Sequence, residues 1–361
     1  MLLTPDEIKL QTRQLWRQAF PLDSEEFLDI YFEDRYTDQR NVTVRRDAKV
    51  VAATQVLPLQ FQFAGAALPA GYISGLATAS EHRGKGYGRK VMREALRKMY
   101  DEGQVLALLI PGDDQLREMY ARPDFGAFQT ASHRISVDIT PAADFEVDSK
   151  LDIEAELEWG DELWQYYNTY AGRHPYEVKH DEDAFFAAIQ SHDLADGQVI
   201  VARKRGKIVG FTLALKEGKL LKGGRRSTKQ FHGVVRFTLT TDERVMHQLH
   251  YRAYQLLEVK ELQMVGWCPG RGFKGSTPYA MARVVNVERF LRIVGRIFPG
   301  LQMSVCVEGD EIIPENNGHY ELMDGQLRIV AQSQANPSTP GALAAVFLLS
   351  QHVLTPMMLD E

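Results

Sequence analysis

A run of glycines and cations between two predicted elements has the clearest chemistry in the sequence. The run Arg83-Gly84-Lys85-Gly86-Tyr87-Gly88-Arg89 follows a predicted strand at 73–78 and opens a predicted helix at 87–101. A helix N-terminus presents unpaired N–H groups and a partial positive charge, which together favour an anion. Glycine lets the backbone approach phosphate oxygens without a Cβ, and Arg and Lys add charge-assisted donors. The run therefore predicts a pyrophosphate site.

Two other phosphate motifs do not fit this run. A dinucleotide-binding turn needs Gly-x-Gly-x-x-Gly with an acidic residue about twenty positions further on, and the spacing here differs. A P-loop needs a terminal Gly-Lys-Ser/Thr, which is absent from the run. On the residues alone, the remaining alternative is an exposed, basic, glycine-rich loop.

The elements around the run predict an α/β domain that is then repeated. Thr4, Pro5 and Glu7 predict the start of a first helix with a capping box. We expect a helix at 24–36, strands at 42–46, 50–57, 59–63 and 73–78, the helix at 87–101 and a strand at 105–110. Residues 140–149 are an acidic linker. After it come helices at 161–170 and 181–191, strands at 199–203 and 208–215, a loop at 217–229, a strand at 234–240, a helix at 242–257 and a strand at 262–267. The repeat lacks the glycines, so we interpret it as a duplicated domain that has lost its phosphate turn.

The last part of the sequence has a different pattern. Residues 284–287 predict a strand and 290–297 a helix, followed by strands at 303–307, 318–322 and 327–330 and a helix at 341–351. This order is typical of a small α+β domain.

Composition excludes several classes of protein. The chain has 361 residues, a net charge of -6 and two cysteines, Cys268 and Cys306. A net negative charge argues against nucleic acid or an anionic membrane as the partner. The separated cysteines argue against a disulfide framework, and the N-terminus has no basic segment leading into an apolar one. We therefore expect a cytoplasmic protein.

The glycine run also carries a resemblance to a known family. Leu76-Ala77-Thr78 followed by Arg83-Gly84-Lys85-Gly86-Tyr87-Gly88 resembles motif A of the GNAT acetyltransferases. The resemblance implies that acetyl-CoA is the co-substrate, with its pyrophosphate on the turn amides and its pantetheine arm on the backbone of Leu76 and Thr78. The implied cofactor-binding residues are Leu76, Ala77, Thr78, Arg83, Gly84, Lys85, Gly86, Tyr87, Gly88 and Arg89.

The whole chain resembles the enhanced-intracellular-survival (Eis-like) acetyltransferases. Met281-Ala-Arg283-Val-Val and Asn316-Asn-Gly318-His-Tyr320 add to the agreement. The implied fold class is α/β and α+β: two tandem GNAT-like domains, the second degenerate, then a sterol carrier protein-like domain. The implied boundaries are 1–140, 150–280 and 281–361. The resemblance also implies transfer of an acetyl group to the amine of a polyamine, an aminoglycoside or a peptide lysine, and a hexameric homo-oligomer.

Two catalytic residues follow from the same resemblance. Tyr120 in Met119-Tyr120-Ala-Arg-Pro-Asp-Phe125-Gly126 takes the role of the general acid toward the CoA thiolate. Pro123 and Asp124 make this segment two residues longer than the family pattern, which raises the question of whether the hydroxyl is displaced. The general base is the terminal carboxylate of Glu361; a frayed chain end is the alternative, with Glu33 or Glu81 as other bases.

Several other patterns are given their simpler interpretation. His247 and His250 share a helix face but have no third ligand, so no metal site is predicted. The basic stretch 216–229 is interpreted as a solvated loop, and the acidic stretch 154–162 as a charged helix start.

The alternative to an enzyme is a binding module that holds acyl-CoA or an apolar ligand without turnover.

Overall fold

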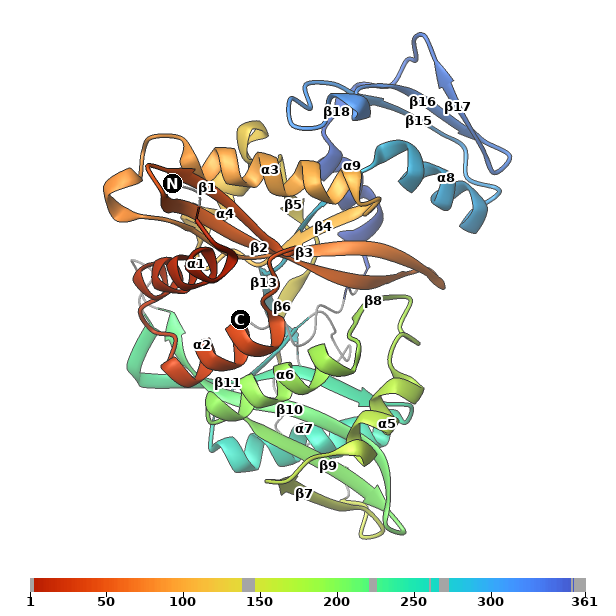
Figure 1. Cartoon of the computed structure of the whole chain (residues 1–361). Coiled ribbons are helices and arrows are strands. Elements are labelled where there is room, and N and C mark those ends of the chain that lie inside the picture. The colour runs from red at the N-terminus through yellow and green to blue at the C-terminus, as the bar shows by residue number, and fades with distance from the viewer. Residues whose placement is uncertain are drawn as a thin grey trace. The chain divides into compact units, whose positions relative to one another are not determined.

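The computed structural model describes residues 3–137, 147–220, 226–259, 261–265, 273–351 and 353. These residues form two compact units (Figure 1). The first unit contains the described residues up to Ala131 together with those of Ala280–Gln351. The second contains the described residues of Ser132–Tyr279 and Val353. The division into three domains at 1–140, 150–280 and 281–361, which the sequence predicts, remains a prediction.

The first unit is built on a mixed sheet with strand order β1-β2-β3-β4-β14-β5. Its strands are β1 (Asn41–Arg46), β2 (Lys49–Phe63), β3 (Ala66–Thr78), β4 (Leu106–Leu109), β14 (Met281–Val284) and β5 (Gln129–Thr130). β2 and β3 form a long hairpin that turns at Ala64 and Gly65, both at positive φ. The two strands predicted at 50–57 and 59–63 are therefore one strand. Pro58 lies past the end of the β1 pairing at Gln55, so that ladder does not need its missing N–H.

Helices cover both faces of this sheet. The helices of this unit are α1 (Pro5–Ala19), α2 (Glu25–Ile30) with a π-turn at Tyr31–Arg35, α3 (Tyr87–Asp101), α4 (Asp114–Ala121), α8 (Val287–Ile297) and α9 (Pro340–Leu348). The predicted capping box is confirmed: the Glu7 N–H donates to Thr4 Oγ1, and the Thr4 N–H donates to the Glu7 carboxylate. One buried core packs α3 against the sheet, and a smaller one packs α1 against its other face.

A small second sheet lies in the C-terminal part of this unit. Its strand order is β17-β16-β15-β18, and α8 packs against β16 and β17. The strands are β15 (Met303–Val307), β16 (Gly318–Met323), β17 (Gln326–Val330) and β18 (Pro337–Ser338). The predicted strand at 284–287 is wrong in part. The chain leaves β14 at Val284, because the Asn286 side chain accepts from the Arg289 N–H and so starts α8.

The second unit is built on a sheet with strand order β13-β6-β12-β11-β10-β9-β7. Its strands are β6 (His133–Val137), β7 (Asp152–Glu156), β9 (Gln198–Lys204), β10 (Lys207–Leu220), β11 (Arg226–Thr240), β12 (Leu262–Val265) and β13 (Phe273–Pro278), with β8 (Tyr176–Lys179) outside this order. Its helices are α5 (Asp161–Tyr170), α6 (Glu182–Leu194) and α7 (Glu243–Leu257).

Two predictions for this unit are corrected. The predicted loop at 217–229 is largely strand, because β10 extends to Leu220 and β11 begins at Arg226. The acidic stretch at 154–162 is divided: Glu154 and Glu156 belong to the edge strand β7, and only Asp161 and Glu162 lie in the first turn of α5. Alternating acidic residues suit an edge strand that has one face in solvent.

The two units share one succession of elements. In the first, the β2–β3 hairpin is followed by α3 and by β4, which pairs with β3 in parallel. In the second, the β10–β11 hairpin is followed by α7 and by β12, which pairs with β11 in parallel. This agrees with the predicted duplication. Among the described residues, no helix is long and apolar enough to cross a membrane.

Candidate active site

β3 continues past the end of its pairing with β4. The parallel register joins Ala70–Tyr72 to Leu106–Leu108, whereas β3 runs on to Thr78. On its other side β3 stays paired with β2 as far as Thr78. In the described chain, no strand pairs with the β4-facing edge of residues 73–78. An extended ligand with amide groups can bind such an edge as an added strand would.

A packed aromatic group fixes the course of this strand. The β2–β3 register shifts opposite Gly75, which has φ +60°, and a Cβ at Gly75 would lie 1.9 Å from the Trp16 ring. Trp16 in turn packs on Tyr31, with ring centroids 4.4 Å apart, and Tyr31 Oη is 2.8 Å from Ser74 Oγ. The position therefore requires glycine, both for its φ and for the close approach of α1. Gly75 could not be recognised from the sequence, since the sign of its role is a contact with Trp16, 59 positions away.

The turn between β3 and α3 leaves the helix N-terminus open. Gly86 is the N-cap of α3 in the left-handed region, at φ +84°, and no side chain caps the helix. The first turn of α3 contains no acidic residue. A Cβ at Gly84 would meet nothing within 4 Å, and one at Gly86 would meet only the Arg89 guanidinium. Space and unpaired amides for an anion are therefore present where the glycine run predicts them.

Three exposed cations surround this turn. Arg83 Nε donates to the Thr78 carbonyl at 3.2 Å, and Lys85 Nζ donates to the Glu81 carbonyl at 2.8 Å. Arg89 Nη1 lies 3.1 Å from Asp124 Oδ2. All ten predicted cofactor-binding residues thus lie at the end of β3, in the turn, or in the first turn of α3. Their charge and the open helix end suit a pyrophosphate.

Tyr120 lies in the last turn of α4 and is mostly buried. Its side chain is 8% exposed and belongs to the core under α3. Its ring makes edge contacts with Phe125 and Phe128, and the Phe128 N–H donates to the Tyr120 carbonyl at 2.9 Å. The ring is therefore held in place by packing, which suits either a structural tyrosine or a positioned acid.

The two extra residues after Tyr120 form an ordered turn. Pro123–Phe125 is one turn of 3-10 helix that ends at Gly126, with φ +109°. Asp124 accepts hydrogen bonds from Arg122 and, across to α3, from Arg89. The insertion therefore connects the Tyr120 segment to the helix whose N-terminus is the predicted anion site. Asp124 was not among the site residues predicted from the sequence.

The predicted general base is not placed by the structure. Glu361 lies outside the described residues. Of the alternatives, Glu33 is exposed on the π-turn after α2. The Glu81 carboxylate accepts hydrogen bonds from its own N–H and from Ser80 Oγ, which holds its pKa below the usual value and makes it a weaker base.

Potential metal ligands occur together once among the described residues, in Cys306, Glu308 and His319 of the C-terminal sheet. Cys306 Sγ donates to Glu308 at 3.4 Å, and His319 Nδ1 lies 3.2 Å from Ser333 Oγ. These hydrogen bonds already explain the positions of the Cys306 and His319 side chains. The two histidines of α7 differ in surroundings: His250 is buried and within 2.9 Å of Thr238 Oγ1, whereas His247 is half-buried.

The sequence comparison agrees with the geometry of the open turn. Residues 2–128 match the family model of the acetyltransferase (GNAT) domain. The match contains β3, the glycine turn and Tyr120. No curated protein matches the sequence.

Solved structures share the fold over nearly the whole chain. A GCN5-related N-acetyltransferase from Anabaena variabilis superposes with TM-score 0.71 at 13% identity, covering 96% of this chain and 88% of that one. Eis1 from Mycobacterium abscessus superposes with TM-score 0.69 at 12% identity, with the same two coverages. A probable N-acyltransferase from Enterococcus faecalis gives TM-score 0.69 at 15% identity, again covering 96% and 88%. At these identities the likeness establishes a GNAT-like α/β fold that extends well beyond residues 2–128.

Proposed function

We propose that this protein is an acetyl-CoA-dependent N-acetyltransferase of the Eis-like type. The observation that carries the proposal is that β3 has an edge with which no described strand pairs, followed by a helix N-terminus that only Gly86 caps. The edge suits the amides of a pantetheine arm, and the glycine cap with its cations suits a pyrophosphate. Fold neighbours named as N-acetyltransferases and a probable N-acyltransferase support the same class of reaction.

The proposed chemistry is direct transfer to an amine. The terminal carboxylate of Glu361 takes a proton from the ammonium group, because only the free amine has a lone pair for attack. The nitrogen then forms a bond to the thioester carbonyl carbon, and the carbon–sulfur bond breaks. Tyr120 donates its proton to the leaving sulfur, and the proton that the nitrogen loses as the amide forms returns to the Tyr120 oxygen, directly or through water. The acceptor we propose is a polyamine, an aminoglycoside or a peptide lysine, and by family resemblance the protein is a cytoplasmic homo-hexamer with a sterol carrier protein-like C-terminal domain.

One observation favours a second candidate, an acyl-CoA-binding protein without turnover. Tyr120 is largely buried between Phe125 and Phe128, as a purely structural tyrosine would be. In this alternative the first unit binds CoA, but nothing protonates the thiolate.

Release of the CoA thiol decides between the two. Mixing the protein with acetyl-CoA and a panel of polyamines, aminoglycosides and lysine peptides should release thiol with at least one amine. Calorimetry should give one CoA per chain, because the second unit lacks the glycine turn. Tight CoA binding without thiol release for any amine would favour the binding protein, and two CoA sites per chain would contradict our assignment of the site.

A further inference from the structure

The small C-terminal sheet of the first unit brings a thiol, an imidazole and a carboxylate together. Cys306 on β15 lies directly opposite His319 on β16, and Glu308 follows two positions after Cys306. Residues that face each other across an antiparallel pair, and residues two apart along a strand, point to the same side of a sheet. Cys306 Sγ, a Glu308 carboxylate oxygen and a His319 ring nitrogen accordingly all lie within 4.8 Å of one another.

These three side chains lie on the solvent side of the sheet. The positions that alternate with them along the two strands point to the opposite face and are buried; they are Val305, Val307, Tyr320 and Leu322. Glu308 is exposed and His319 is half-buried, whereas Cys306 is only 1% exposed. A cation can therefore reach the cluster from solvent through the carboxylate and the imidazole, with the sulfur next to them.

The separation of the thiol and the carboxylate fits a shared zinc ion. Bonds of about 2.3 Å to sulfur and about 2.0–2.2 Å to oxygen, at a tetrahedral angle, place the two ligand atoms about 3.5 Å apart. Cys306 Sγ and Glu308 Oε1 are 3.4 Å apart, joined by the thiol proton. A zinc ion would take the place of that proton: the S–H bond breaks, the proton goes to water, and the thiolate sulfur binds the metal.

The hydrogen bonds of the cluster leave ligand atoms available. Among the described residues, the hydrogen bond from Cys306 is the only one that the Glu308 side chain makes. His319 Nδ1 lies 3.2 Å from Ser333 Oγ, and within the same described part of the chain Nε2 has no partner. The Ser333 hydroxyl orients the imidazole, as the outer hydrogen-bond partner of a metal-bound histidine does. No cation competes for the carboxylate among the side chains that the structure describes.

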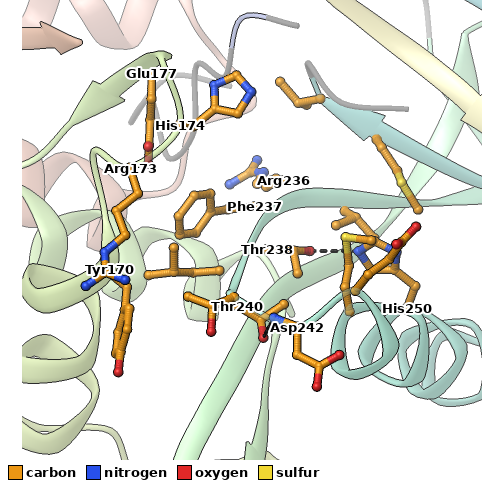
Figure 2. A pocket seen from close by; sticks show the side chains of 17 residues that line it. Tyr170, Arg173, His174, Glu177, Arg236, Phe237, Thr238, Thr240, Asp242 and His250 are labelled. Atoms are coloured by element: carbon orange, nitrogen blue, oxygen red, sulfur yellow. Dashed lines mark hydrogen bonds between the residues drawn. The ribbon is translucent and has the colours of Figure 1, made fainter. Parts of the chain in front are cut away.

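The cavity of the second unit also contains histidines and acids, but their atoms are engaged. Figure 2 shows His250 directed at Thr238, and its Nε2 is 2.9 Å from Thr238 Oγ1. Asp242, on the same wall, caps α7 by accepting from the Arg244 N–H at 2.9 Å. Over the described ranges of the chain, three potential ligand atoms of these types meet at the Cys306 cluster alone.

We propose that Cys306, Glu308 and His319 form a zinc site, with water as the fourth ligand. A thiolate and an imidazole favour Zn²⁺, whereas Mg²⁺ and Ca²⁺ take oxygen ligands. The ion joins β15 to β16 on the outer face of the sheet. None of its ligands belongs to the proposed acetyl-CoA site, so zinc binding does not depend on acetyl transfer.

A cobalt titration of the full, reduced chain without a histidine tag tests the site. Co²⁺ accepts the tetrahedral ligand sets of Zn²⁺, and a cobalt–thiolate bond gives a charge-transfer absorption in the near ultraviolet. We expect this absorption to saturate at one Co²⁺ per chain, to disappear when one equivalent of Zn²⁺ is added, and to persist in excess Mg²⁺. No thiolate absorption at millimolar Co²⁺, or its loss in Mg²⁺, would overturn the proposal.

Variants at the two cysteines then identify the sulfur ligand. Cys306→Ser should abolish the cobalt–thiolate absorption. Cys268→Ser, at the other cysteine of the sequence, is the matched control and should leave the absorption unchanged. Absorption that survives in Cys306→Ser, or that is lost in Cys268→Ser, would refute the assignment.

Variants at the other two ligands keep the test decisive even if Cys306→Ser does not fold. Loss of an outer partner of a metal ligand costs about 10–100-fold in affinity, so His319→Gln and Glu308→Gln, which remove ligands, should each weaken zinc binding at least about ten-fold. Both should retain the thiolate absorption at saturating Co²⁺. His247→Gln, at a half-buried histidine of α7, is the control and should bind zinc as the unmodified chain does. Unchanged zinc affinity in both His319→Gln and Glu308→Gln would contradict the proposed site.

Discussion

Arg283 and Asp310 form a buried ion pair that joins the first sheet of the first unit to its C-terminal part. Arg283 Nη2 lies 2.6 Å from Asp310 Oδ2, and the two side chains are 1% and 2% exposed. Arg283 Nη1 donates to the Gly126 carbonyl at 2.9 Å, and Asn316 Nδ2 donates to Asp310 at 2.9 Å. Arg283 and Asn316 belong to the two segments that the family resemblance singles out, and the structure brings them together on one carboxylate.

Loss of Arg283 should therefore destabilise the first unit. Arg283→Met leaves the Asp310 charge buried without its partner, and breaking a buried pair from one side costs about 3–5 kcal/mol. Arg97→Met, at a partly exposed pair with Glu315, is the control and should cost less than about 1 kcal/mol. Urea unfolding followed by circular dichroism measures both losses. Similar losses in the two variants would show that the buried pair has no special role.

Gly86 should be needed for CoA binding beyond its effect on folding. Gly86→Val adds backbone strain of about 1–2 kcal/mol at φ +84° and places a branched side chain where we expect phosphate oxygens. Gly206, in the β9–β10 turn, has φ +75° and nothing within 4 Å of its Cβ position, so Gly206→Val is a matched control for strain alone. By calorimetry, CoA affinity should fall at least about ten-fold in Gly86→Val and stay unchanged in Gly206→Val. An equal effect in the two variants would remove the turn from the proposed site.

The glycine turn could be predicted from the sequence because its chemistry depends on neighbouring residues. The anion site needs a strand, glycines at φ-permissive positions and a helix start, and all of these lie within residues 73–101. Gly75 and Asp124 could not be recognised in the same way. Gly75 matters because the Trp16 ring approaches it, and Asp124 because it reaches Arg89 on α3. Such contacts have no local pattern.

The pairing partners of β14 could not be predicted from the sequence, for the same reason. Residues 281–284 pair with β4 and β5, which precede them by more than 150 positions. The sequence instead predicted a strand at 284–287 within the small C-terminal domain, because apolar residues are equally compatible with a strand there. The capped start of α8 at Asn286 was missed because the valines around it suggest a strand.

Replacement of Tyr120 should impair catalysis without impairing CoA binding. Tyr120→Phe removes the proton donor but keeps the ring between Phe125 and Phe128, so the first unit should stay folded. We expect kcat to fall about 10²–10⁴-fold with CoA affinity unchanged. Tyr100→Phe, on the last turns of α3, is the control and should retain full turnover. Turnover of Tyr120→Phe within a factor of about two of the unmodified protein would end its assignment as the acid.

Glu177 should make the stability of the second unit depend on pH. Its pKa is raised from 4.5 to about 7, chiefly by burial, while the Gly172 N–H, the His174 backbone and the charge of Lys179 act in the opposite direction. The folded state therefore holds the proton more tightly than the unfolded state. This contribution to stability is complete below pH about 4.5 and is lost as the pH rises to about 7, a change of about 3 kcal/mol.

The change should disappear in Glu177→Gln, which does not titrate at this position. Urea unfolding at a series of pH values from 5 to 8 compares the slope of the unfolding free energy in the two proteins. Parallel slopes would mean that Glu177 titrates normally in the folded chain.

The last prediction tests whether the main-chain or the side-chain carboxylate of Glu361 is the general base. If the base is the terminal carboxylate, Glu361→Gln retains it and should keep most of the activity. A few residues appended after Glu361 move that charge and add bulk, so they should abolish turnover but spare CoA binding. Deletion of Asp360 and Glu361 should also abolish turnover, since an extended chain advances about 3.3 Å per residue and the new carboxylate falls short.

The opposite pattern of activities would keep Glu361 as the general base but assign the role to a different carboxylate of that residue. An inactive Glu361→Gln with an active extended chain would assign the base to the Glu361 side chain. Full activity in all three variants would exclude the tail and require a base in the first unit. Glu33 would then be tested before Glu81, because the hydrogen bonds that hold the pKa of Glu81 low also weaken it as a proton acceptor. Loss of thiol release in Glu33→Gln, with CoA binding intact, would identify that base.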